Sequence, residues 1–285
     1  MLHIATVHYA SPRWIEIQTS HLRRHLSVPY TTWTSLQRID PQYGRYFDRV
    51  IRQAGPHSDK LNHLALEISH EAEDEDLLMF LDGDAFPIAD PMPTVQAALR
   101  DSALVAIRRA ENADEPQPHP SFCVTRVGTW RALPGDWSRS YVWGESDGRL
   151  VSDVGANLLR ALELTQTPWS EILRTNGGAV NPLFFGIYGD IVYHHGAGFR
   201  TAGIITRTDS AGVPQTRRKP RVPVLAELSR FLERRRRRVW QARVQARNRE
   251  QSDVIFEKIA AGEPGWVDYV RAIQGEPRPA AAVSP

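Results

Sequence analysis

The sequence contains a single cysteine, Cys123, among 285 residues. One cysteine cannot form an internal disulfide, and without a cysteine cluster we expect no cysteine-based zinc site. No apolar run approaches the roughly 20 residues that a membrane-spanning helix needs. The first residues, MLHIATVHYASP, lack a basic start and a small-residue cleavage site, so we do not expect a signal peptide. These absences make the cytoplasm the expected compartment.

The chain combines an ordinary apolar content with a strong segregation of charge. Hydrophobic residues make up 41% of it, as in soluble globular proteins, and its length suffices for one large α/β domain. The formal net charge is only +2. Between Arg217 and Arg249, however, thirteen Arg and Lys accompany two Glu, a net charge of +11 that leaves −9 for the rest. An acidic body with a basic arm suggests contact with an anionic surface, or docking of the arm on the body.

The first 110 residues alternate between segments typical of strands and segments with helical spacing. The expected strands are at 2–10, 30–36, 77–81 and 103–110, and the expected helices are at 13–26, 60–72 and 94–100. We expect Ser58 or Asp59 to cap the second helix. This alternation predicts an α/β fold with a Rossmann-type parallel sheet flanked by helices.

Beyond residue 111 the pattern loosens. We expect a strand at 121–127, a tryptophan-rich irregular stretch, a capped helix at 152–164 and a strand or hairpin at 183–199. The predicted organisation is a body, a polar linker, a basic helical extension ending in a shorter helix, and a disordered Pro- and Ala-rich tail; these are residues 1–205, 206–223, 224–274 and 275–285.

The most informative stretch is LLMFLDGDAFPI, residues 77–88. Its first five residues form an apolar run typical of a strand buried on both faces. Asp82 and Asp84 follow the run. Side chains at i and i+2 share a face of extended backbone, so the carboxylates repel each other unless a cation or hydrogen-bond donors lie between them. In open α/β sheets, ligands bind beyond the carboxyl ends of strands, where this pair lies.

Two interpretations of the aspartate pair stay open. The carboxylates could cap backbone amides in a turn, or they could bind a hard divalent cation, Mg²⁺ or Mn²⁺, shared with ligand phosphates. The Asp-x-Asp pattern alone is weak, because about one copy is expected by chance in a chain of this length. A second copy, Asp74 to Asp76, is interpreted as a solvated loop.

Residues 1 to about 200 resemble nucleotide-sugar-dependent glycosyltransferases of the GT-A fold, on the strand–helix alternation and the D-x-D sequence FLDGDAFP. The resemblance implies a nucleotide-sugar-binding part, 1–112, and an acceptor- and metal-completing part, 113–205. It implies that Asp84 is a metal ligand and that Asp82 contacts the metal or the ribose. A bound Mn²⁺ or Mg²⁺ would stabilise the negative charge on a nucleoside diphosphate leaving group, of which UDP is the expected one.

A histidine pair in IYGDIVYHHGAGFR resembles the late H-x-x-G element that completes the metal shell in several GT-A families. His195 with Gly198 matches that spacing, and His194 lies one residue earlier. The alternative is that these are hydrogen-bonded core histidines. The basic-Pro-Trp continuation found in one retaining group of these enzymes is missing here.

The resemblance also implies donor contacts on two elements. The helix before the aspartate strand offers Lys60 to the diphosphate, with Asn62 or His57 for the sugar or ribose. The end of the first strand, Val7, His8 and Tyr9, is where the family binds the nucleotide base. The alternative for Lys60 is a surface lysine.

An inverting transferase needs a general base near the acceptor hydroxyl. Asp153, with Arg160 two turns later, resembles the Asp-plus-Arg element of inverting GT-A enzymes, although Ser152 replaces the usual Glu. Ser152 or Asp153 could instead be an ordinary helix N-cap. Glu145 and Asp147 are the reserve candidates. Three tryptophans in the irregular stretch suit the apolar faces of a carbohydrate acceptor, although tryptophan is also common in cores; they are Trp130, Trp137 and Trp143.

The arm carries Leu228, Phe231, Leu232, Val239 and Trp240 on a helix dense in arginine. It could lie on an anionic membrane, which would suit a glycolipid acceptor and a peripheral location at the inner membrane face. It could also bind nucleic acid, or pack on the acidic body.

The predicted function is therefore a metal-dependent, inverting glycosyltransferase with a carbohydrate or glycolipid acceptor. One rival is a sugar nucleotidyltransferase, although HYASPRW lacks the glycine-rich phosphate loop expected after the first strand. The other is a non-catalytic membrane or nucleic-acid adaptor with a degenerate transferase body.

Overall fold

The structure is a computed structural model that describes the chain except for residues 113, 134–135, 147–148, 178–182, 197–222 and 274–285. Several predictions fall on the omitted segments. Asp147, Gly198, the 275–285 tail and all but the last residue of the 206–223 linker lie outside the described residues.

A seven-stranded sheet forms the centre of the molecule, with its strands in the order β10-β6-β7-β4-β1-β2-β3. The strands are β1 (Leu2–Tyr9), β2 (Tyr30–Gln37), β3 (Arg49–Ile51), β4 (Leu77–Asp82), β6 (Leu104–Ile107), β7 (His119–Arg126) and β10 (Trp169–Ile172). Neighbours pair in parallel except at β7, which runs antiparallel to β4 and β6. The predicted α/β class is confirmed, and β7 is the exception to the predicted parallel order.

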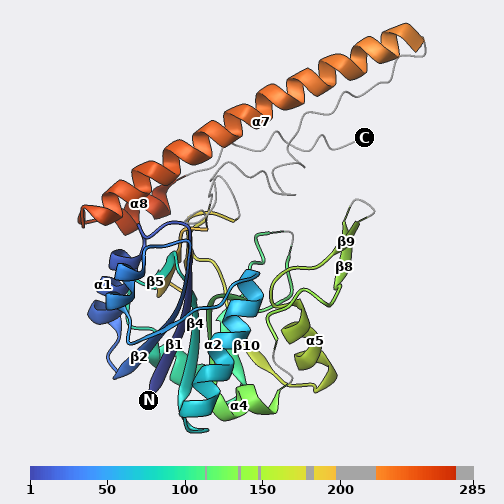
Figure 1. Ribbon diagram of the computed structural model, residues 1–285. Helices are drawn as coiled ribbons and strands as arrows, with labels where there is room; N and C mark the ends of the chain where they lie inside the picture. The colour runs from blue at the N-terminus through green and yellow to red at the C-terminus, as the bar shows by residue number, and fades with distance from the viewer. Residues whose placement is uncertain (113, 134–135, 147–148, 178–182, 197–222, 274–285) are drawn as a thin grey trace.

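Helices cover both faces of this sheet (Figure 1). One face carries α2 (His57–Glu71), α4 (Val127–Ala132) and α5 (Ala156–Leu164), and the other carries α1 (Ile15–His25) and α3 (Met92–Ala98). Alternate residues of β4 enter the two cores: Leu78 and Phe80 on the α2 side, Met79 and Leu81 on the α1 side. Because both faces are covered, the strand is apolar until its carboxyl end.

A second, three-stranded sheet has the order β11-β12-β5 and consists of β5 (Ala85–Pro87), β11 (Gly186–Tyr188) and β12 (Val192–His194). It begins two residues after β4 ends, so the D-x-D sequence lies at the junction of the two sheets. β12 runs antiparallel to β5 and pairs His194 with Ala85. The hairpin predicted at 183–199 is confirmed as β11–β12, and it is brought directly against the aspartates.

The remaining elements lie at the edges of this core. They are the short helix η1 (Pro41–Tyr46) and the hairpin of β8 (Gly144–Ser146) and β9 (Arg149–Val151). The predicted basic helix is the 38-residue α7 (Pro223–Ala260), followed by the short α8 (Trp266–Ala272). Figure 1 shows that the arginine-rich first part of α7 extends away from the sheets, whereas its end and α8 lie against them.

Both predicted helix caps are wrong. α2 begins at His57 after Pro56, and neither Ser58 nor Asp59 caps it. α5 begins at Ala156, and its N-cap is Gly155, with a φ of 88° and without a side-chain hydrogen bond. An added Cβ at Gly155 would lie 2.2 Å from the Pro118 carbonyl oxygen, so this tight entry requires glycine.

Candidate active site

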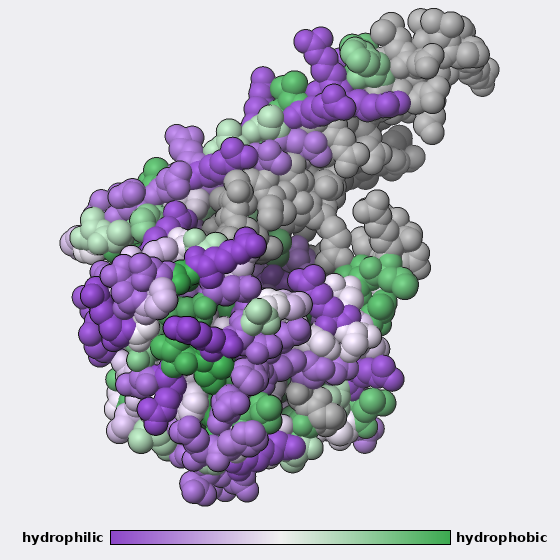
Figure 2. Space-filling model, viewed as in Figure 1, coloured by the Kyte–Doolittle hydropathy of each residue, from purple (hydrophilic) through white to green (hydrophobic). Residues whose placement is uncertain are grey.

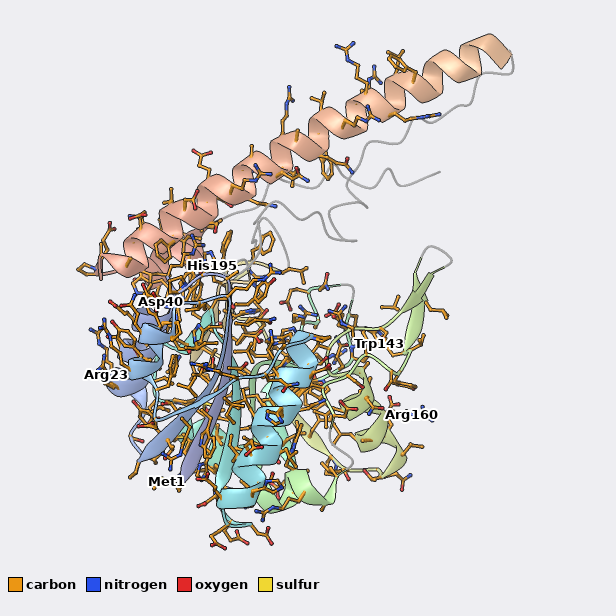
Figure 3. The ribbon with its side chains drawn as sticks, viewed as in Figure 1. Met1, Arg23, Asp40, Trp143, Arg160 and His195 are labelled. Carbon is orange, nitrogen blue, oxygen red and sulfur yellow. The ribbon has the colours of Figure 1, made fainter. Side chains whose placement is uncertain are left out.

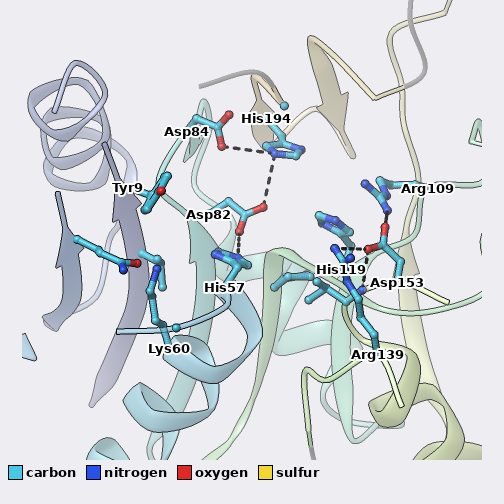
Figure 4. Close-up of a pocket in the computed structure, with 16 residues that line it drawn as sticks. Tyr9, His57, Lys60, Asp82, Asp84, Arg109, His119, Arg139, Asp153 and His194 are labelled. Atoms are coloured by element: carbon cyan, nitrogen blue, oxygen red, sulfur yellow. Dashed lines mark hydrogen bonds and ion pairs between the residues drawn. The ribbon is translucent and has the colours of Figure 1, made fainter. Parts of the chain in front are cut away.

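Asp82, Asp84 and His194 form a cluster at the carboxyl end of β4 (Figure 4). The Nε2 atom of His194 lies 3.5 Å from Asp82 Oδ2 and 3.5 Å from Asp84 Oδ1. One ligand atom from each of the three residues lies within 4.8 Å of the others, a unique grouping of its kind in the part of the chain that the structure describes. Asp84 and His194 are buried.

The backbone of the D-x-D turn is fixed by the buried Gln18 of α1. Its Nε2 donates to the carbonyl oxygens of Asp82 and Ala85, at 2.8 Å each. Its Oε1 lies 3.1 Å from His8 Nε2. His57, the first residue of α2, lies with Nε2 2.9 Å from Asp82 Oδ1. The turn is therefore held from both faces of the sheet, and Asp82 is oriented by a histidine.

The structure brings His194, rather than His195, to the aspartates. Successive side chains of a strand point to opposite faces, so only one of the pair can face the cluster. His195 is fully buried on the other side, with Nδ1 2.8 Å from the Tyr193 hydroxyl and Nε2 2.8 Å from Ser252 Oγ. Burial lowers the pKa of His195 to about 3, so its ring is neutral.

The cluster opens into a cavity of about 470 Å³. On the β1 side, Val7 and Tyr9 line it, whereas His8 points to the opposite face and contacts Gln18. The ammonium group of Lys60 lies 5.1 Å from the centre of the Tyr9 ring and also lines the cavity. Burial lowers the pKa of Lys60. This wall thus offers an aromatic ring and a cation next to the carboxylates.

The opposite wall of the cavity carries Asp153 between two arginines. Arg109 Nη2 lies 3.0 Å from Asp153 Oδ2, and Arg139 Nη2 lies 3.0 Å from Asp153 Oδ1. Arg109 is buried and also binds Glu115 at 2.6 Å. Although burial acts to raise it, Arg109 and the Val154 amide hold the pKa of Asp153 below its usual value. Asp153 is therefore an ionised carboxylate that faces the cavity.

The structure does not bring the other predicted residues to the cavity. Asn62 instead holds the 136–138 turn, donating to Asp136 at 2.6 Å and accepting from the Trp137 amide at 2.9 Å. Trp130 and Trp137 are core residues that pack on Phe80, with ring centres 4.7 and 4.9 Å away.

The remaining candidates lie further out. Trp143 is half-buried beside the β8–β9 hairpin, and Arg160 projects from the outer face of α5 over Tyr141 (Figure 3). Only the backbone of Glu145 is described, as part of β8. None of these three residues lines the cavity that the described residues form.

Sequence reasoning missed Arg109, Arg139 and His119 as residues that line the cavity. For Arg109 a signal exists, because it follows the buried strand β6 just as the aspartates follow β4. His119 and Arg139 reach the site through contacts between segments distant in sequence, which no local pattern predicts.

The three side chains of the cluster fit a divalent cation. Mg²⁺ takes ligands at about 2.1 Å in octahedral geometry, which places adjacent ligand atoms about 3 Å apart. The His194 distances of 3.5 Å to each aspartate are close to that separation. Two carboxylates with one imidazole suit a hard or borderline divalent ion. Asp82, Asp84 and His194 could thus hold a metal, and they leave the cavity side open for other ligands.

Comparison of the sequence with family models and with curated proteins finds no match. Comparison with solved structures finds glycosyltransferases of the GT-A class, the class that the sequence resembles. The glycosyltransferase GlyE of Streptococcus pneumoniae has 14% identity, aligned over 46% of this chain and 35% of its own, with a TM-score of 0.35. Mouse xyloside xylosyltransferase 1 has 11% identity over 47% of this chain and 69% of its own, with a TM-score of 0.33.

The galactosyltransferase LgtC, solved with donor and acceptor sugar analogues, has 11% identity over 46% of this chain and 59% of its own, with a TM-score of 0.32. The chain matches only about a third of the length of GlyE. At such low identity and partial overlap, the functional argument rests on the site residues themselves.

Proposed function

We propose that this protein is a metal-dependent glycosyltransferase that moves a sugar from a nucleoside diphosphate donor to a hydroxyl acceptor. The observation that carries the proposal is the Asp82–Asp84–His194 cluster, which lies between a wall with Tyr9 and Lys60 and a wall with Asp153. A cation held there would neutralise the charge that develops on the departing diphosphate. UDP as the carrier and Mn²⁺ or Mg²⁺ as the ion complete the proposal.

The donor would bind across the β1 side of the cavity. Tyr9 offers a ring on which a base can stack, and Val7 offers apolar contact at the floor. Lys60 would face the diphosphate, where its positive charge adds to that of the ion. His57 holds Asp82 at 2.9 Å and would keep that carboxylate oriented toward the ion or the ribose.

On the acceptor side, Asp153 would act as the general base in an inverting reaction. A base must be ionised before it can accept the hydroxyl proton, and Asp153 meets this condition at neutral pH. Arg109 and Arg139 would fix its orientation, at the cost of a weaker proton affinity. A carbohydrate or glycolipid would enter from this side.

The test is nucleotide release from a panel of nucleotide sugars by the full-length protein, with Mn²⁺, with Mg²⁺ and with chelator. We expect release of the nucleoside diphosphate that requires the metal and disappears in Asp84→Asn. Asp90→Asn, an aspartate outside the cavity, is the matched control and should keep full activity. Metal-independent release, or full activity of Asp84→Asn, would remove the proposal. Pyrophosphate as the released product would favour the nucleotidyltransferase alternative.

The arm supports a second, separate proposal, contact with an anionic membrane. Phe231, Leu232 and Val239 of α7 are 61%, 43% and 46% exposed. They lie among arginines along a helix whose surface is mostly hydrophilic with apolar residues between (Figure 2). Among the described helices, none is long and apolar enough to cross a membrane. A basic helix with exposed apolar groups suits a peripheral position at the inner membrane face, whereas nucleic acid would use the arginines alone.

A further inference from the structure

His195 lies directly behind the metal-binding cluster, on the side that faces α7 (Figure 3). Its Nε2 is 2.8 Å from the hydroxyl of Ser252, a residue of α7 that is 3% exposed. Its Nδ1 is 2.8 Å from the hydroxyl of Tyr193. The ring packs against Trp14, with the ring centres 4.5 Å apart. Both ring nitrogens are thus engaged, and one of them is held by the C-terminal helix.

The backbone of His195 is tied to the cluster on both sides. Its N–H donates to the carbonyl oxygen of Asp84 at 3.0 Å, and its carbonyl oxygen accepts from the Phe185 amide at 3.1 Å. The preceding residue is His194. A rotation of His195 would therefore displace one metal-binding residue through a hydrogen bond and the other through the chain.

The part of α7 that carries Ser252 is itself firmly packed. Ile255 and Ile259 lie in one buried cluster with Trp14, Phe86 and Tyr193, which belong to the first 205 residues. From α8, Arg271 forms an ion pair at 2.9 Å with Asp190, in the turn between β11 and β12. This half of the helix is fixed to the hairpin that presents His194.

We propose that Ser252 is a positioning residue of the metal site, which holds His195 so that His194 and the Asp84 backbone keep the geometry for a divalent cation. The inference rests on the proposed metal-dependent function. It makes the second half of α7 part of the site, although the sequence places it in a separate extension. Residues that orient metal ligands from behind commonly contribute a factor of 10–100 in metal affinity.

The test is calorimetric titration of the full-length protein with Mn²⁺ alone, alongside thermal unfolding. We expect Ser252→Ala to bind Mn²⁺ about tenfold more weakly. Ile255→Val is the matched control, because it removes buried volume from the same stretch of α7 without touching the hydrogen bond. It should lower the melting temperature while leaving the Mn²⁺ affinity unchanged. Should Ser252→Ala fail to fold, Ser252→Cys keeps the volume with a weaker donor and should also bind Mn²⁺ more weakly.

The outcomes separate the two proposals. If the wild-type protein does not bind Mn²⁺, the proposed function fails and this inference fails with it. If the wild type binds Mn²⁺ and the Ser252 variants bind it equally well, only the positioning role is overturned. Equal losses of affinity in Ser252→Ala and Ile255→Val would also overturn it, because general destabilisation would then explain both.

Discussion

Asp153 is the residue whose role the site leaves most open to experiment. If it is the base, Asp153→Asn should lower kcat about 10²–10⁴-fold with donor KM little changed, since the amide cannot accept the proton. The product should have an inverted anomeric centre. The measurement is steady-state kinetics with NMR analysis of the product.

Arg139→Gln is the control for this role. Removal of a neighbouring positive charge should raise the pKa of Asp153, so the acidic limb of the pH–rate profile should move to higher pH while activity remains. An Asp153→Asn enzyme near full rate, or a product with retained configuration, would take Asp153 out of the mechanism.

At this scale the sequence predicted the aspartate pair better than its partners. Asp82 and Asp84 follow an apolar run that can be recognised locally, and they lie where a strand end predicts a ligand site. The choice between His194 and His195 depended on which face of β12 packs against β5, a contact about 110 residues away in the chain. Asn62 has a suitable side chain on the expected helix, but Asp136 is its partner.

Helix α1 is the element whose docking depends most clearly on pH. His21 Nδ1 lies 3.0 Å from the Pro87 carbonyl oxygen, and burial lowers the pKa of His21 to about 4. The unfolded chain, with a histidine pKa near 6.5, takes up a proton that the folded protein does not. Stability should therefore fall as the pH drops from about 6.5 toward 4.

We expect His21→Gln to lose part of this dependence, about 1 kcal/mol between pH 7 and pH 5 after allowance for partial exposure. Urea unfolding at the two pH values measures it. A residual slope should remain from His8, whose pKa burial also lowers to about 4. An identical slope in the variant and the wild type would contradict the assignment to His21.

Long elements were predictable from the sequence, and short ones were not. The first strands and helices appear where periodicity places them, because their apolar faces span several residues. β5 and β10, with three and four residues, depend on pairing with β12 and β6. Gly155 and Pro56 begin helices at positions where Ser and Asp seemed better caps, because chain geometry set by packing outweighs local preference.

At the scale of the whole molecule, the segregation of charge predicts binding to anionic bilayers. The full-length protein should bind vesicles that contain phosphatidylserine and not vesicles of phosphatidylcholine alone. Each arginine near the surface contributes about 1 kcal/mol, so Arg235→Gln with Arg236→Gln should weaken binding by about tenfold or more. Sedimentation with vesicles measures the partition.

The control for the arm removes the same charge elsewhere. Arg23→Gln with Arg24→Gln on α1 should leave the partition unchanged, because these side chains lie on the body. Equal losses in both double variants would mean that net charge alone drives binding. Binding to single-stranded oligonucleotides without binding to vesicles would favour nucleic acid as the partner of the arm.

The central claim is that Asp82, Asp84 and His194 hold a divalent cation against the diphosphate of a nucleotide. The most direct measurement is anomalous scattering from Mn²⁺ in crystals of the protein grown with UDP. The account predicts one strong peak within coordination distance of all three side chains, with diphosphate oxygens completing the shell and the base beside Tyr9. UDP bound there without a metal peak, or a Mn²⁺ peak away from Asp84, would contradict it.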